Sequence, residues 1–203
     1  MGLAQETDEN LMLRFGRGEA AAFDFLYRRH ELKVFRYLQR NVKSEASAND
    51  LMQEVWFAVV RGAANYQPTA KFTTWLFTIA HNRMVDMVRA NHRLQSLDTG
   101  DVADPEGAES EGAESEGPSL LDRLAADRKL EPLAQVQSQD EAAALLSAVE
   151  QLPAEQRSAF LLQAEGELSV EEIADATGSN FETVKSRLRY ARAKLRQLLW
   201  EYA

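Results

Sequence analysis

Cysteine is absent from this sequence of 203 residues. Disulfide bonds and metal sites built from thiolates are therefore excluded. The first residues contain no basic segment followed by an apolar block, and no apolar run approaches the length that crosses a bilayer. The sequence therefore predicts a cytoplasmic protein with no direct membrane insertion.

Signatures of catalysis are also missing. The sequence contains no Walker loop, no HExxH motif, no GxSxG motif and no cysteine nucleophile. His30, His81 and His92 lack the spacing of metal ligands. We therefore expect no catalytic residue, no metal site and no cofactor, and an enzyme is the weakest of the function classes considered.

Negative charge is abundant but unevenly distributed along the chain. The net charge at pH 7 is -9. Residues 1–94 carry 13 Lys and Arg against 10 Asp and Glu, whereas residues 95–149 carry 3 against 13. The acidic part includes the low-complexity repeat EGAESEGAESEG at 106–117, which cannot bury enough apolar surface to offset its ordering entropy. We interpret residues 95–136 as a flexible acidic linker that becomes weakly helical from about residue 119.

The last third of the chain has the pattern of a helix-turn-helix. Ser169 and Glu172 have the spacing of a capping box, which starts a helix and is typically worth about 1 kcal/mol. Gly178 can adopt the left-handed conformation of a tight turn, and a second helix opens near Ser179 or Asn180. An apolar stripe on this second helix is expected to pack inward. Its members are Phe181, Val184, Leu188, Ala191, Leu195 and Leu198.

The opposite side of the second helix is polar and basic. A helix of this kind can enter the major groove of DNA, with cations on phosphates and with Lys185, Ser186 or Arg187 at base edges. The alternative is an amphipathic helix whose basic face is only solvated. The capped helix and the glycine turn before it favour DNA binding.

Residues 1–94 are predicted to form an all-helical unit. A long helix follows Gly18, a second runs from about Ala48 to Arg61, and a third runs from about Phe72 to Arg89. The second helix is apolar around most of its circumference but carries one polar stripe, which is either a docking face or an ordinary solvated face. That stripe consists of Asp50, Gln53, Glu54, Phe57 and Arg61.

The third helix leaves a narrow window between two apolar faces. The window contains Trp75, Thr78, His81, Asn82, Asp86 and Arg89, and the preceding loop adds Tyr66 and Lys71. An aromatic plane, an amide and a cation on one side of a helix are typical of sites that hold unpaired bases, where stacking is worth roughly 1–3 kcal/mol per base. For Trp75, periodicity alone favours a place in the core.

Four motifs follow one another in the order found in a known family. They are DLMQEVW at 50–56, FTTWLFTIAHN at 72–82, LP at 152–153 continuing to RSAFLL at 157–162, and TVKSRL at 183–188. Together they resemble the extracytoplasmic-function (ECF) group of bacterial RNA polymerase sigma factors, in the sigma-seventy family. The resemblance implies an all-α fold of two small domains, a helical bundle at 1–94 and a helix-turn-helix domain at 137–203, joined by the acidic linker.

The resemblance also implies partners and site residues. The partners are RNA polymerase core enzyme, promoter DNA and an anti-sigma protein that covers the polymerase-docking surfaces. Docking to core polymerase is implied for Asp50, Leu51, Gln53, Glu54 and Phe57. Melting and recognition of the minus-ten element, with capture of a flipped base, are implied for Tyr66, Lys71, Trp75, Asn82 and Arg89. Recognition of the minus-thirty-five element is implied for Thr183, Lys185, Ser186, Arg187, Arg189, Tyr190 and Arg192.

Two departures from the family pattern leave the promoter preference open. The loop at 67–71 replaces a short Arg-Gly stretch, and Tyr190 stands where arginine is common. The alternative class is a helix-turn-helix regulator with an N-terminal sensor or dimerisation domain, which leaves the window on the third helix unexplained. We also expect the free chain to bind DNA weakly, because its modest basic surfaces are joined by an acidic segment and polymerase is needed to fix their spacing.

Overall fold

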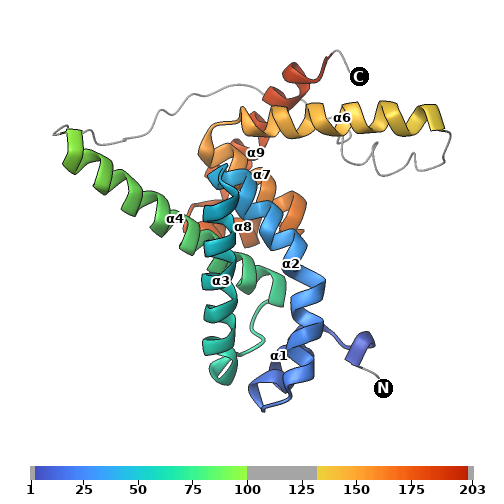
Figure 1. The fold of residues 1–203 in the computed structure, drawn as a ribbon, viewed down its shortest axis with the longest axis vertical. Coiled ribbons are helices and arrows are strands. Elements are labelled where there is room, and N and C mark those ends of the chain that lie inside the picture. Colours follow the sequence, from blue (N-terminus) through green and yellow to red (C-terminus); the bar gives the residue numbers. More distant parts are fainter. Residues whose placement is uncertain (1–2, 100–131, 201–203) are drawn as a thin grey trace.

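The computed structural model describes residues 3–99 and 132–200 (Figure 1). These residues form helices and no strands, which confirms the expected all-α class. The first part contains η1 (Leu3–Gln5), α1 (Asp8–Gly16), α2 (Ala20–Val42), α3 (Glu45–Gly62), η2 (Ala63–Asn65) and α4 (Phe72–Thr99). The second part contains α6 (Pro132–Glu150), α7 (Ala154–Gly166), α8 (Val170–Thr177) and α9 (Phe181–Leu198).

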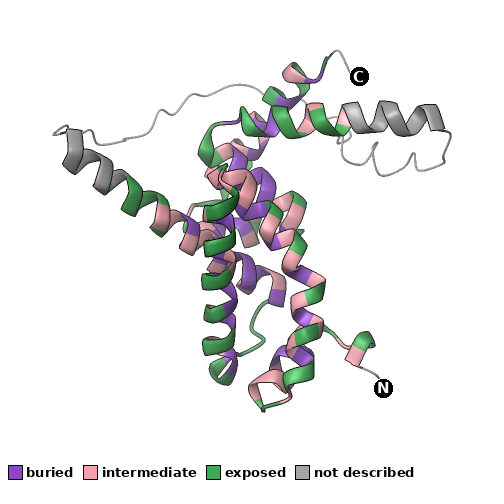
Figure 2. Cartoon of the chain, viewed as in Figure 1, coloured by how far each residue is buried: buried purple, intermediate pink, exposed green. Residues whose placement is uncertain are grey.

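Helices α1 to α4 form an N-terminal bundle. Helix α2 packs on α1 and α3, and α3 packs in turn on α4. Each helix buries one stripe and exposes the other, so buried and exposed segments alternate along α2 and α3 (Figure 2). Leu26 and Val34 of α2, Val55 of α3 and Leu76 of α4 are fully buried in this core. Helix α1, which was not predicted, begins at an N-cap where the Thr7 side chain accepts a hydrogen bond from the Asn10 amide.

The helix-turn-helix is confirmed in its local details. Ser169 Oγ accepts from the Glu172 amide at 3.2 Å, and Glu172 Oε2 accepts from the Ser169 amide at 2.8 Å, which completes the capping box. Gly178 takes a φ of 63° at the turn, and the Asn180 side chain caps α9. One expectation for the apolar stripe is wrong: Phe181 is 41% exposed, because it is the first residue of α9 and lies at the end of the stripe.

Helices extend into both ends of the expected linker. Helix α4 continues past Arg89 to Thr99, since no proline or glycine interrupts it before Gly100. Helix α6 begins at Pro132, and proline is well tolerated at a first helical position. The expected linker at 95–136 is therefore helical at 95–99 and at 132–136, whereas residues 100–131 lie outside the described residues.

The N-terminal bundle packs directly against the C-terminal helices, in what we call the closed arrangement. Helix α2 contacts α7, and helix α4 contacts both α7 and α8 (Figure 1). Gly166 of α7 allows the close approach, because a Cβ atom there would lie 3.2 Å from the ring of Phe77. Lys33 pairs with Glu167 at 2.5 Å, and Arg40 pairs with Glu165. The sequence predicted a tether between the two units and gave no sign of this contact.

Candidate polymerase and nucleic-acid interfaces

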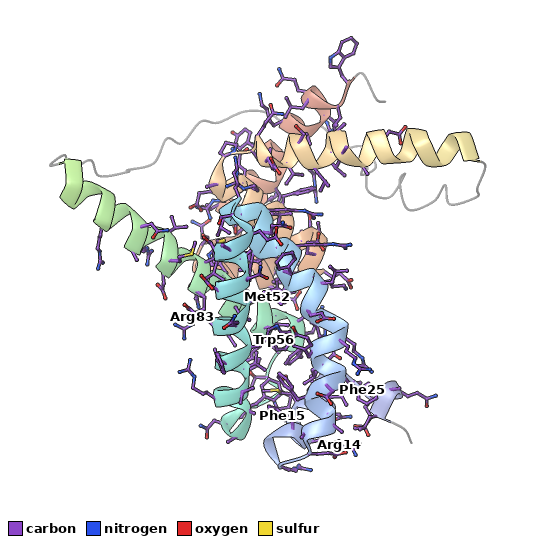
Figure 3. All side chains as sticks on the ribbon, in the orientation of Figure 1. Arg14, Phe15, Phe25, Met52, Trp56 and Arg83 are labelled. Carbon is purple, nitrogen blue, oxygen red and sulfur yellow. The ribbon has the colours of Figure 1, made fainter. Side chains whose placement is uncertain are left out.

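An apolar groove of about 820 Å³ lies between α2 and α3. Met52 and Trp56 of α3 line it on the side that faces α2 (Figure 3). Its rim contains large exposed apolar side chains, with Phe57 63% exposed, Leu32 54% and Val60 44%. Solvent-facing apolar groups clustered in this way mark a surface for a protein partner.

The residues predicted to dock core polymerase divide between the groove and the core. Gln53 and Phe57 line the groove, while Asp50 and Glu54 are exposed on α3. Leu51 is buried, with 1% exposure, so its side chain packs in the bundle and does not reach the docking face. It lies one position away from Asp50, which places it about 100° around the helix from the polar stripe.

The loop before α4 places Tyr66 against two other aromatic rings. The Tyr66 ring centroid is 5.1 Å from that of Trp75 and 6.3 Å from that of Phe72. Burial raises the pKa of the Tyr66 phenol to about 12, and the negative charges of Glu9 and Asp8 add to this. The phenol oxygen has no hydrogen-bond partner among the described residues. Tyr66 and Trp75 therefore form one aromatic cluster at the start of α4, in which Tyr66 is buried, with 8% exposure, and Trp75 is half-buried.

The rest of the predicted window on α4 is divided between solvent and the C-terminal helices. Asn82 and Arg89 are exposed. Asn82 lies seven residues beyond Trp75, which is about 10 Å further along the same side of the helix. His81 lies between the two units, since its Nδ1 is 3.0 Å from Tyr37 Oη of α2 and 3.3 Å from Ser158 Oγ of α7.

The start of α4 is also held by the capping box of α8. Thr74 Oγ1 donates to Glu172 Oε1 at 2.9 Å, and Lys71 Nζ lies 3.3 Å from the same oxygen. Burial would raise the pKa of the Glu172 carboxyl, but the hydrogen bonds from Ser169, Thr74 and Lys71 outweigh it and lower the pKa. The closed arrangement thus engages Lys71, one of the predicted minus-ten cations, with an acid of the helix-turn-helix. No sequence signal pointed to this contact, because its partners are about a hundred residues apart.

Several cations of α9 have partners inside the C-terminal unit. Arg187 donates to Ser179 Oγ at 2.8 Å and pairs with Glu155 at 2.7 Å, and Arg192 donates to Gln163 Oε1 at 2.7 Å. The Arg189 guanidinium lies 5.0 Å from the centre of the Tyr190 ring. Lys185 is exposed, and Thr183 and Ser186 are half-buried. In this arrangement Arg187 and Arg192 help to hold α9 against α7 and the turn.

Comparison with known proteins identifies the family. A model of sigma-70 region 2 matches residues 26–94, and a model of sigma-70 region 4 matches residues 142–195. The RNA polymerase sigma factor CarQ of Myxococcus xanthus is 30% identical over 191 residues, covering 94% of this chain and 96% of CarQ. The ECF RNA polymerase sigma factor SigE of Mycolicibacterium smegmatis is 33% identical over 192 residues, covering 92% of this chain and 66% of SigE. The chain belongs to the ECF group of the sigma-70 family.

Solved structures of sigma factors share the fold of this ECF family member. CnrH in complex with the cytosolic domain of CnrY has a TM-score of 0.62 and 22% identity, covering 98% of this chain and all of that chain. RpoE of Bartonella quintana in complex with the anti-sigma factor NepR has a TM-score of 0.61 and 20% identity, covering 88% of this chain and 96% of that chain.

Within residues 3–99 and 132–200, none of the helices combines the length and the hydropathy needed to cross a bilayer.

Proposed function

We propose that this ECF sigma factor binds RNA polymerase core enzyme and directs promoter-specific initiation through two DNA-binding units, 1–94 and 137–203. The observation that carries the proposal is the combination, in one chain, of an aromatic cluster at the start of α4 with a capped helix-turn-helix. The first suits an unpaired base and the second suits duplex DNA. Because the two units match sigma-70 region 2 and region 4, we assign both of them to promoter recognition.

Core polymerase docks, in this proposal, on the α2–α3 groove. Phe57 supplies an exposed apolar anchor, and Gln53 beside it supplies a polar group. Asp50 and Glu54 add negative charge at the rim, where charged groups chiefly set orientation and association rate.

Opening of the minus-ten element takes place at the start of α4. The half-buried Trp75 offers aromatic surface for a base that has left the stack, and the exposed Asn82 amide offers hydrogen bonds to a base edge. Tyr66, at 8% exposure, packs against Trp75 and supports its ring. Lys71 and Arg89 meet backbone phosphates. Lys71 must leave Glu172 to do so, which links minus-ten binding to separation of the two units.

The minus-thirty-five element is read by the first turns of α9. Lys185 and Ser186 reach base edges together with Thr183, while Arg189 contacts phosphate beside Tyr190. Arg187 and Arg192 either exchange their internal partners for DNA or act by holding the reading helix in place.

An anti-sigma partner is the proposed regulator. The α2–α3 groove is an exposed apolar surface that such a protein can cover and so deny to polymerase. Two relatives of the same fold, CnrH and RpoE, are described in complex with CnrY and with the anti-sigma factor NepR.

The test is transcription from a genomic fragment library by core polymerase with and without this chain, followed by mapping of the start sites. We expect new start sites that share two sequence elements at a constant separation, together with retention of the chain by immobilised core polymerase. A core enzyme that neither retains the chain nor gains start sites would contradict the proposal.

A further inference from the structure

Helix α1 holds both ends of the loop that carries Tyr66. It precedes the segment matched by the sigma-70 region 2 model, which begins at residue 26. At the near end of the loop, Gly16 packs on the backbone of η2, and a Cβ atom at Gly16 would lie 2.4 Å from the carbonyl oxygen of Ala63. Only glycine permits this approach without a shift of the backbone.

At the far end, Glu9 caps α4. Its Oε1 accepts a hydrogen bond from the Phe72 amide at 2.8 Å, and Phe72 is the first residue of α4. The first amides of a helix have no acceptor within the helix, and a negative charge beside them is favourable. A carboxylate from a helix 63 residues earlier in the chain therefore fixes where α4 begins.

The cap is effective because α1 is anchored elsewhere. Asp8, next to Glu9, accepts from Arg29 at 2.6 Å and lies 2.7 Å from His30 Nε2, and both partners belong to α2. Burial would raise the pKa of Asp8, but these two partners outweigh it and lower the pKa. Arg14 pairs with Glu19 at 2.7 Å at the other end of α1, beside the start of α2 (Figure 3).

The loop end that Glu9 fixes is part of the aromatic cluster. Phe72 contacts Trp75, with ring centroids 5.9 Å apart, and it also contacts Tyr66 and His30. A displacement of the Phe72 backbone therefore moves the surroundings of Tyr66 and Trp75 together.

We propose that Glu9 is a positioning residue for minus-ten recognition: with Gly16 it holds the loop from Ala63 to Phe72 so that the buried Tyr66 supports Trp75, whose half-buried ring is preformed to meet an unpaired base. The inference rests on the proposed function for the DNA step. Its structural part, the cap on α4, is tested without DNA.

The first experiment measures hydrogen exchange of the Phe72 amide in the full chain. Glu9→Ala should speed exchange about tenfold, as expected for loss of one charge-assisted hydrogen bond, with a smaller change in Glu9→Gln, which keeps an acceptor oxygen. Asp24→Ala, which removes an exposed carboxylate from α2, is the matched control and should leave the exchange unchanged. Wild-type exchange in Glu9→Ala would overturn the cap.

The second experiment measures DNA binding by holoenzyme. The probes are a single-stranded oligonucleotide copied from the non-template minus-ten element of a mapped promoter, and a duplex carrying only its minus-thirty-five element. Glu9→Ala should weaken binding of the single-stranded minus-ten probe about tenfold. It should leave binding of the minus-thirty-five duplex and retention by core polymerase unchanged. Glu9→Gln should restore most of the binding to the minus-ten probe. Gly16→Ala should follow the same pattern.

The outcomes separate the two proposals. Equal loss on both probes would mean general destabilisation and would overturn the positioning role, as would wild-type binding by Glu9→Ala. If wild-type holoenzyme binds neither probe, the proposed function fails, and the exchange experiment still decides whether Glu9 caps α4.

Discussion

His81 lies where the two helical units meet. Burial lowers the pKa of its ring; Glu155 of α7 opposes the shift, and the positive charges of Arg187 and Arg89 add to it. The neutral ring can accept a hydrogen bond from Tyr37 or Ser158 at Nδ1, which the doubly protonated ring cannot do. The closed arrangement thus favours the neutral form.

This preference predicts a pH dependence of stability. Because the folded-state pKa of His81 is below its usual value of 6.5, the unfolded chain takes up the proton more readily. The contribution of His81 to the free energy of unfolding should be fully present above pH 6.5 and should be lost as the pH falls through the folded-state pKa. Urea unfolding between about pH 7.5 and 5 measures it.

The matched variant for this measurement is His81→Asn, which has no titrating group and should show a flatter pH profile over the same range. The carboxyl groups of Asp8, Glu167 and Glu172, whose pKa values are lowered, titrate below this window and so do not obscure it. Identical profiles for the wild type and His81→Asn would refute the assignment.

Helix α3 carries two functions on two faces. Leu51 and Val55 belong to the buried face, whereas Phe57 projects from the opposite face into the groove. A helix can separate packing from docking in this way because neighbouring residues point about 100° apart.

Substitutions on the two faces should therefore affect different properties: the exposed face should affect retention by core polymerase, and the buried face should affect stability. Phe57→Ser should reduce retention by core polymerase about tenfold or more, while changing the free energy of unfolding by no more than about 0.5 kcal/mol, because the side chain is 63% exposed. Leu51→Ala should cost about 2–5 kcal/mol of stability by leaving a cavity.

Trp200→Ser provides the control for Phe57, since Trp200 is also a large exposed apolar side chain, at 70% exposure. It should leave retention by polymerase unchanged. Pull-down on immobilised core enzyme and urea unfolding measure the two quantities. Wild-type retention of Phe57→Ser would exclude the α2–α3 groove as the docking surface.

In the whole molecule, acids of the C-terminal unit meet cations of the N-terminal unit. Glu165 pairs with Arg40 and Glu167 with Lys33, and Glu172 engages Lys71. Lys33 lowers the pKa of the Glu167 carboxyl by a hydrogen bond and by its charge. We expect these contacts to hold the closed arrangement together in the free chain.

Neutralising two of these acids should favour opening of the free chain. The absence of cysteine in the chain allows a dye pair to be placed at Arg28→Cys and Lys194→Cys. Glu165→Gln combined with Glu167→Gln should lower energy transfer between the dyes. The dependence of the transfer on salt should also weaken, because the exposed Lys33–Glu167 pair is screened.

Glu45→Gln combined with Glu171→Gln is the charge-matched control, because both carboxylates are exposed. It should leave energy transfer at the wild-type value. Equal transfer in the two double variants would show that these ion pairs do not hold the units together.

The parts of the fold that the sequence predicted are those with local causes. The capping box at Ser169, the turn at Gly178 and the start of α9 each depend on groups within four residues of one another. Helix α1 was missed although Thr7 and its acidic first turn are a local start signal, because the helix is short and only its packing makes it important.

Spacing along the chain was therefore enough to predict the all-α class, the starts and ends of several helices and the family motifs. Only the packing of the folded chain brings His81 next to Ser158 and Glu9 to the start of α4. The physical reason is that a hydrogen bond or a packed ring acts over a few ångströms in space, and nothing in the spacing of residues 63 or 77 positions apart indicates that they will meet.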